Sequence, residues 1–560
     1  MTDTMDRTRT PGDLADGAAG APRRRRWWHR NTGRAPVLHH YVGRQTLRRY
    51  RPFLYLALIA LSFIYGFAFA LFGRYLMVPL LTPVALLALV ALWLLPASDR
   101  PPTRLLQGAF AALFVAHLCW PDYLAIALPF LPWITLLRLT GAVLLLVLLV
   151  CLSVSPRFRR ELGAILAANR TVVVLFAVFM GMGLVTLPLS ADPVFSANRF
   201  VSAQIAWTAV LFAGCWVLAQ PGNATRFSYA VWAVAIFVCA IGVVEWRMQQ
   251  IPWRDHIPSL LRVGDESVLG ILEGAERAYV GIYRVQSKFG HSIGLGEFLS
   301  FAVPFVVHLM MTARRLWVRV GAGATLPLIL YIDIRTDSRS AMVGLLIAGV
   351  LYGLAWGVIR WRRQPDSVLA PAIVFGAPAA AAVLGSAILF VGRVRKIFLG
   401  GGEYQSSTDV RSTMYNLGLD KILGNPIGHG MGRGGVELGF FLADGRLTID
   451  TYYIAVGLEY GVIGFVAFFG MFLLAFWTGI RTAVANRDPE ISFILPAAIS
   501  LLSFVVIKGV YAREENHPFV FMLLALVMAL HWRHVAAAPA TASAKQRPSQ
   551  VARTRLVKMA

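Results

Sequence analysis

Charged side chains gather at one set of ends of the long apolar runs in this chain. Ionisable residues are costly at membrane depth, so each of them is a candidate functional residue. Arg284 and Arg339 stand out, because glycines and serines lie near them and the short turn T-D-S-R-S holds Arg339. The other members are Glu245, Lys288, His291, Glu297, Asp333, Arg335, Asp337, Lys508, Arg513, Glu514, Glu515 and His517. Their convergence predicts one polar site, although charges at helix ends can also simply ring a membrane interface.

A long polar, glycine-rich loop at residues 393–450 carries further candidates. S-S-T-D at 406–409 supplies N-cap residues and G-N-P at 424–426 supplies a stop. A helix of about four turns is therefore expected between them. The following glycines permit tight turns and close approach of the backbone to a ligand. No strand precedes them and no Gly-Lys-Ser/Thr follows, so the segment does not match nucleotide-binding loops.

Arg411 lies on the packing side of this expected helix. Its stripe contains Tyr415, Gly418 and Ile422, whereas the polar stripe contains Asp409, Thr413, Asn416 and Asp420. Two interpretations stay open for Arg411. Either its stem covers apolar surface while its head reaches water, or its head binds an anion.

Asp450 opens the apolar run that follows the loop. At helical spacing its face contains Ile454, Gly457, Gly461 and Gly464. The spacing Gly457-xxx-Gly461 is typical of close helix packing. Glu459 faces the opposite side. We therefore expect Asp450 at the mouth of the site and Glu459 as a buried group bonded to another span.

The composition predicts an all-α polytopic membrane protein. Of the 560 residues, 57% are hydrophobic and 15% are charged, and the mean hydropathy is +0.62. Apolar runs of about 20 residues indicate transmembrane helices. About fourteen are expected, at 53–72, 76–95, 105–120, 134–153, 172–189, 199–219, 228–247, 293–311, 317–334, 339–359, 369–391, 451–479, 490–511 and 517–534.

The Lys/Arg bias of the short connections gives the orientation. If the N-terminus is cytoplasmic, basic clusters around Arg157, Arg319 and Arg360 lie inside. The polar residues named above then face the periplasm, and an even number of spans places both termini in the cytoplasm. Residues 1–50 lack the apolar core of a cleavable signal peptide.

Five parts are expected along the chain. They are a disordered basic cytoplasmic tail at 1–50, transmembrane helices 1–11 at 51–392 with a periplasmic loop near 248–292, the large, partly helical periplasmic loop at 393–450, transmembrane helices 12–14 at 451–535, and a cytoplasmic tail at 536–560. The formal charge of +24 favours contact with anionic lipid headgroups and not with nucleic acid. The four cysteines show no paired or metal-ligand spacing, which indicates small apolar fillers.

Three sequence blocks resemble those of the O-antigen ligase and polymerase superfamily of membrane glycosyltransferases. The first is the arginine-containing stretch 284–297, and the second is T-D-S-R-S-A at 336–341. The third combines N-P-x-G-x-G at 425–430, D-T-Y-Y-I at 450–454 and E-x-G-x-x-G at 459–464. The likeness covers roughly residues 170–480. Core-ligase members have a histidine where this chain has aspartate at the start of D-T-Y-Y-I, which favours a polymerase.

The resemblance implies transfer of a glycan from a polyprenyl diphosphate carrier to a sugar hydroxyl at the periplasmic face of the bacterial inner membrane. The leaving diphosphate requires cations, and guanidinium groups match phosphate oxygens with a planar fork. On this basis Asp450, Arg339 and Arg284 are the candidate catalytic residues. The candidate substrate-binding residues are Arg411, His429, His291, Arg335 and Tyr453.

The implied reaction is a metal-independent, inverting transfer without a cofactor, because the sequence has cations but no dense acidic cluster for Mg²⁺. The implied partners are a lipid-linked glycan donor, a glycan acceptor and membrane lipids, with a flippase and a chain-length regulator as candidate protein partners. Two alternatives stay open. One is a ligase that transfers glycan to lipid A-core. The other is a transporter for lipid-linked sugars. Such proteins often show internal repeats, and this sequence has no convincing repeat.

Overall fold

The computed structural model describes residues 87–92, 94–98, 101–127, 133–276, 283–390, 405–441 and 447–557, with scattered positions between 53 and 63. The chain divides into two compact units, Met1–Val84 and Ala85–Ala560. All elements below belong to the second unit, and the first part of the large loop, 393–404, lies outside the described residues.

Helices dominate the described part of the chain. They are α3 Thr103–Cys119, α4 Leu136–Val154, α5 Pro156–Ala168, α6 Arg170–Val185, α7 Pro193–Ala203, η1 Gln204–Thr208, α8 Ala209–Ala219, α9 Asn223–Met248, η2 Arg254–His256, η3 Ser259–Leu261, α10 Glu266–Glu273, α11 Ser292–Thr312, α12 Leu316–Arg335, α13 Arg339–Arg363, α14 Leu369–Phe390, α16 Gln405–Gly424, α17 Gly434–Leu438, α18 Tyr452–Ala485, η5 Ile491–Phe493, α19 Ile494–Ile507 and α20 His517–Val557. Two short antiparallel pairs join β1 Ala125–Ile126 to β2 Ile134–Thr135 and β3 Ala275–Glu276 to β4 Tyr283–Arg284.

The predicted spans from residue 105 onward all fall on helices. By length and apolarity, eight of the described helices can cross a membrane, or nine if the pair α5 and α6, bent by 97°, counts as one span. The all-α, multi-pass membrane architecture is therefore confirmed. The number fourteen stays a prediction, because the spans 53–72 and 76–95 lie mostly outside the described residues.

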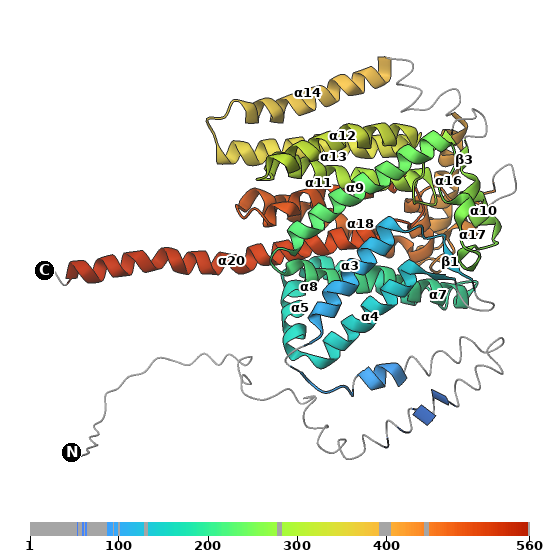
Figure 1. Cartoon of the computed structure of the whole chain (residues 1–560), viewed down its shortest axis with the longest axis horizontal. Helices are drawn as coiled ribbons and strands as arrows, with labels where there is room; N and C mark the ends of the chain where they lie inside the picture. Colours follow the sequence, from blue (N-terminus) through green and yellow to red (C-terminus); the bar gives the residue numbers. More distant parts are fainter. Residues whose placement is uncertain are drawn as a thin grey trace. The chain divides into compact units, whose positions relative to one another are not determined.

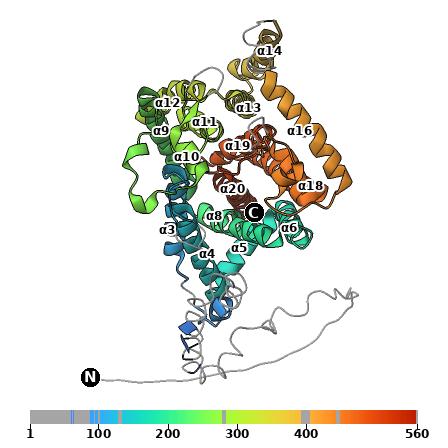
Figure 2. The same cartoon turned by 90° about the vertical axis from the view of Figure 1, so that its right-hand side faces the viewer.

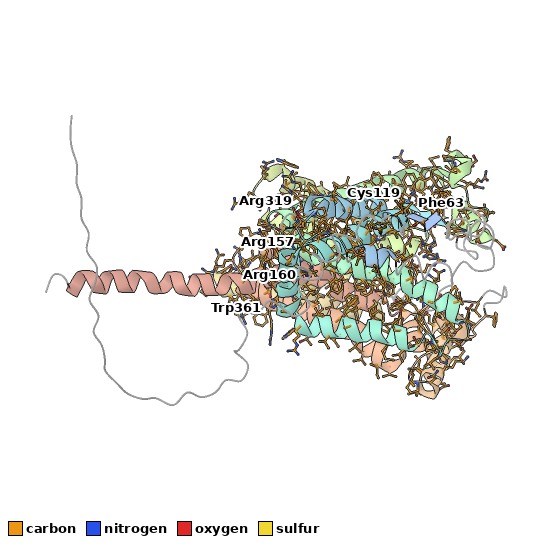
Figure 3. The ribbon with its side chains drawn as sticks, turned by 90° about the horizontal axis from the view of Figure 1, so that it is seen from below. Phe63, Cys119, Arg157, Arg160, Arg319 and Trp361 are labelled. Carbon is orange, nitrogen blue, oxygen red and sulfur yellow. The ribbon has the colours of Figure 1, made fainter. Side chains whose placement is uncertain are left out.

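The two ends of the helical bundle differ in what they carry. Arg157, Arg160 and Arg319 lie toward the left-hand end in Figure 3. Helices α16 and α17, together with β3, lie at the right-hand end in Figure 1. Basic connections and the large loop are thus separated along the bundle, which is the separation that the positive-inside rule requires.

Helix α11 lies at the centre of the bundle, where it packs against α12, α13 and α19. Its apolar window is 83% buried, against 28% for α13, whose outer face is left for lipid. Helix α18 packs along α6 and α19, and Figure 2 shows α16 lying beside it. Aromatic rings fill the interior, for example Phe472 and Phe504 with centroids 4.9 Å apart.

Helix α18 is interrupted at Gly461, whose φ of 69° and ψ of −175° are not helical. The loop at 425–430 fills the break. Val462 N donates to Pro426 O at 2.9 Å, and His429 N donates to Leu458 O at 2.8 Å. A Cβ on Gly461 would overlap the Pro426 carbonyl oxygen, so only glycine fits there. The N-P-x-G-x-G and E-x-G-x-x-G blocks therefore form one interlocked structure.

This break corrects one prediction from helical spacing. Asp450 precedes the helix, which begins at Tyr452 with Thr451 as N-cap, so no continuous face joins Asp450 to Gly464. The packing prediction was right for the first half of α18. A Cβ on Gly457 would lie 2.5 Å from the Ile422 side chain of α16.

Candidate functional site

The first two sequence blocks meet in space through Arg284. Its Nε donates to Thr336 O at 3.0 Å and its Nη2 donates to Asp337 O at 3.4 Å. The backbone N–H of Val285 also donates to the Arg335 carbonyl at 3.0 Å. Arg284 therefore holds the turn that precedes α13.

A buried carboxylate fixes the strand that carries Arg284. Glu245 accepts hydrogen bonds from Tyr283 Oη at 2.9 Å, Gln286 N at 3.0 Å and Ser287 N at 2.6 Å. The side chain is fully buried. Buried carboxylates are tolerated where such donors satisfy them, and this explains Glu245 without a role in chemistry.

A cavity of 630 Å³ brings together four of the predicted site residues: Arg284, His291, Arg411 and Asp450. Arg513 also lines it, on the turn between α19 and α20. We call this space the arginine cavity. Three arginines and one aspartate line the cavity, so it is suited to an anion with several acceptor oxygens.

His291 lines the arginine cavity in its neutral form. Its Nδ1 accepts from Ile293 N at 3.1 Å and so caps α11. Burial, together with the guanidinium groups of Arg284 and Arg513, lowers the pKa of His291 to about 3. At neutral pH the positive charge in the cavity therefore comes from the arginines.

Helix α16 delivers Arg411 as the sequence predicted. The stripe of Asp409, Thr413, Asn416 and Asp420 is exposed, and Met414 and Ile422 on the other side are buried. Within the described part of the chain, Arg411 Nε is buried without a hydrogen-bond partner. Its place in the cavity wall favours anion binding over a head that only reaches bulk water.

Asp450 lies in the extended segment just before α18. Thr448 Oγ1 lies 3.5 Å from Asp450 Oδ1, a distance at the limit of a hydrogen bond. The neighbouring Thr451 hydroxyl donates to Tyr415 Oη at 3.0 Å. The bond from Thr451 to Tyr415 ties the segment to α16, the helix that carries Arg411.

Four predicted site residues do not line the arginine cavity. Arg335 stacks over Trp246, with its Cζ 4.1 Å from the ring centroid. Tyr453 Oη donates to Val505 O at 2.6 Å, and His429 Nδ1 lies 3.0 Å from Leu458 O. Arg339 is the first residue of α13, directly after the N-cap Ser338. The contacts of Arg335, Tyr453 and His429 indicate structural roles.

A buried ion pair fixes the turn that carries Arg513. Lys508 Nζ lies 2.9 Å from Glu297 Oε1, with both side chains fully buried, and donates to Arg513 O at 2.6 Å. Asn516 Nδ2 donates to Glu297 Oε2 at 2.8 Å. Breaking such a pair from one side typically costs about 3–5 kcal/mol. Lys508 and Glu297 are therefore positioning residues for the turn between α19 and α20.

A second cavity of 420 Å³ brings Glu459, which the sequence analysis did not assign to the site, together with Arg513 and Glu514, which it did. Glu459 and Glu514 line it with Arg199, Arg513 and Tyr452. We call it the glutamate cavity. The expectation that Glu459 bonds another span was wrong, because its Oε1 accepts from the backbone N–H of Gly434 in the large loop at 3.1 Å. No periodicity signalled this, since the partner is a backbone amide.

Residues 324–469 match the family model described as O-antigen ligase. The match contains the turn before α13, helix α16 and the interlocked break of α18, whereas Arg284 and the turn with Arg513 lie outside it. The resemblance to the O-antigen ligase and polymerase superfamily is thereby confirmed for this segment, and the chain is a multi-pass membrane protein that carries an O-antigen ligase domain. No curated protein matches the chain. Within the described residues, no group of three or more His, Cys, Asp or Glu is placed to hold a metal ion.

Proposed function

We propose that the protein polymerises oligosaccharide repeat units carried on polyprenyl diphosphate, at the periplasmic face of the bacterial inner membrane. The observation that carries the proposal is the arginine cavity, which Arg284, Arg411 and Arg513 line together with Asp450. The diphosphate of the donor is the anion that these groups fit. Polymerase is preferred to ligase because aspartate stands at 450, where core-ligase members have histidine.

In the proposed step the acceptor hydroxyl oxygen attacks C1 of the donor sugar. The bond between C1 and the phosphate oxygen breaks, and its electron pair leaves with the diphosphate. Asp450 accepts the hydroxyl proton, and the arginines stabilise the charge that grows on the leaving group. A single displacement inverts the configuration at C1. The guanidinium groups supply the positive charge, so we expect turnover to persist in EDTA.

Arg339 stays in the proposed site as a residue near the leaving group. It begins α13, three residues after Thr336, whose carbonyl Arg284 holds. The start of a long helix also offers backbone N–H groups to an anion. Arg339→Ala and Arg284→Ala should abolish chain growth with normal insertion. Arg339→Lys should lose most activity, because a point charge does not replace a bidentate fork.

The test is reconstitution of the full-length protein with lipid-linked repeat units from cells that lack it. A ladder of longer glycans on the carrier supports the polymerase. Glycan attached to added lipid A-core indicates the ligase, and translocation without a change in product size indicates a transporter. Arg319→Ala, which removes an arginine at the opposite end of the bundle, is the charge-matched control.

Asp450 is tested separately in the same assay. Asp450→Asn keeps the size of the side chain and removes the base, so turnover should fall by about 10²–10⁴-fold. Asp450→His should keep part of the activity, because imidazole can also accept the proton. Full turnover by Asp450→Asn would show that Asp450 is not the general base.

A further inference from the structure

The glutamate cavity adjoins the arginine cavity along a thin wall. Both are lined by Leu447, Ile449, Ala512 and Arg513. The segment that begins at Leu447 therefore has the arginine cavity on one side and the glutamate cavity on the other. Asp450 lies in this same segment and lines the arginine cavity.

The two carboxylates of the glutamate cavity are held in place but keep acceptor capacity. Gly434 N donates to Glu459 Oε1 at 3.1 Å, and Tyr452 Oη donates to Glu514 Oε1 at 3.1 Å. The backbone N–H of Gly432 is a further donor to the Glu459 carboxylate. A carboxylate has about four acceptor positions, so both can accept from further hydroxyl donors.

The remaining lining residues fit an uncharged, hydroxyl-rich ligand. Arg199 and Arg513 supply N–H donors and Tyr452 supplies an aromatic ring. A Cβ on Gly432 would lie 2.9 Å from the Phe195 ring and 3.0 Å from the Arg199 side chain, so glycine at 432 lets the loop pack closely against these residues. Two carboxylates disfavour a phosphate here, in contrast to the neighbouring cavity.

We propose that the glutamate cavity binds the acceptor glycan, and that Glu459 and Glu514 accept hydrogen bonds from its sugar hydroxyls. This inference rests on the proposed function, because it assigns the second substrate of the same reaction. The acceptor sugar lies along the shared wall, and its attacking hydroxyl reaches past Ile449 and Ala512 to Asp450 and the donor C1. Glu459 and Glu514 hold the acceptor and do not take the proton of the attacking hydroxyl.

The experiment measures the two ligands separately on the full chain in nanodiscs. The glycan probe is the free repeat-unit oligosaccharide released by mild acid from lipid-linked intermediates, and the donor-side probe is undecaprenyl diphosphate. Glu459→Gln and Glu514→Gln keep an oxygen that can accept from Gly434 N and Tyr452 Oη. Each should weaken glycan binding about tenfold or more, because hydrogen bonds to a charged group are lost. Binding of undecaprenyl diphosphate should change less than twofold.

The matched control is Glu437→Gln on α17. Glu437 lies 3.9 Å from Arg433 and lines neither cavity, so both binding constants should stay unchanged. Thermal unfolding of each variant shows whether the fold is intact. In the elongation assay the two cavity variants should raise the KM for acceptor more than they lower kcat.

Wild-type glycan affinity in both variants would overturn the assignment, and so would an equal loss of glycan and diphosphate binding. Failure of the acceptor site and failure of the polymerase give different results. If the wild-type protein elongates glycans and the variants keep their acceptor KM, the acceptor site is wrong and the polymerase stands. If the wild-type protein binds the glycan through Glu459 and Glu514 without elongating it, the acceptor site stands as a glycan site and the polymerase is wrong.

Discussion

The arginine cavity and the glutamate cavity share a wall but carry opposite charge patterns. The first is lined by Arg284, Arg411 and Arg513 against one carboxylate, and the second is lined by Glu459 and Glu514 with two arginines. Arg513 lines both. The contrast teaches that this end of the bundle does not present one uniform basic surface. The arginine cavity suits an anion, and the glutamate cavity suits an uncharged ligand that donates hydrogen bonds.

The two cavities also differ in how their charges are held. Arg284 donates to two backbone carbonyls, and Arg411 Nε is buried without a partner among the described residues. Glu459 already accepts from the backbone N–H groups of Gly432 and Gly434, and Glu514 accepts from Tyr452 Oη. An incoming anion would therefore give a buried donor of the arginine cavity a hydrogen-bond partner, whereas it would meet only acceptors at the glutamates of the other cavity. This difference is the basis of the following predictions.

Arg411→Ala should give the largest effect and act on the arginine cavity alone. Removing one preorganised donor to a developing charge typically costs about 10²–10³-fold in kcat. Protein stability should stay the same or rise, because the buried Nε has no partner to lose. Elongation kinetics and thermal unfolding measure both. Asn416→Ala, on the exposed side of the same helix, is the control. A loss of glycan binding in Arg411→Ala would show that the two cavities do not bind separate ligands.

Ala512→Phe should give an intermediate effect on both cavities at once. Ala512 lies in the shared wall, so a phenyl ring would narrow both spaces. Even one misplaced methylene typically changes specificity by about 10–200-fold, so we expect kcat/KM to fall by about tenfold or more. Ala512→Ser changes the volume little and should leave the rate close to wild type. A change in only one binding constant of Ala512→Phe would show that the cavities are not joined at this residue.

His291→Asn should give the smallest effect, on stability as a function of pH. The folded-state pKa of about 3 lies below the ordinary value of 6.5, so the unfolded chain binds the proton more readily. The part of the free energy of unfolding that depends on His291 being neutral is fully present above pH 6.5. It is lost as the pH falls toward 3. When the pH falls from 7.5 to 5, the free energy of unfolding of the wild-type protein should drop by about 2 kcal/mol more than that of the variant. Asparagine can still cap α11, and equal losses in unfolding experiments would contradict a buried neutral histidine.

The sequence predicted what depends on local patterns. Apolar runs placed the helices from residue 105 onward, and cap and stop residues placed α16 with Arg411 on its packing side. Arg284, His291, Arg411 and Asp450, which the sequence analysis drew from helix ends and from the large loop, line one cavity, and their role in a site stays a prediction. The helices were predicted well because helical periodicity fixes which side of an element a residue occupies.

The sequence could not predict what depends on long-range backbone contacts. The break of α18 arises where the loop at 425–430 donates to and accepts from helix backbone, and no side-chain pattern records such bonds. Glu459 was consequently predicted outside the site, although it lines the glutamate cavity. Arg335 was predicted in the site from its charge, and nothing in the sequence indicated its stacking on Trp246.

Gly461 divides α18 into a short first half and a long second half. Residues 452–460 make about 14 Å of helix, less than half of the roughly 30 Å hydrocarbon core, whereas residues 462–485 suffice to cross it. If the large loop is periplasmic as predicted, the second half by itself suffices as the stop-transfer signal during insertion. The first half, with Glu459, would then dock after translocation of the loop that holds it.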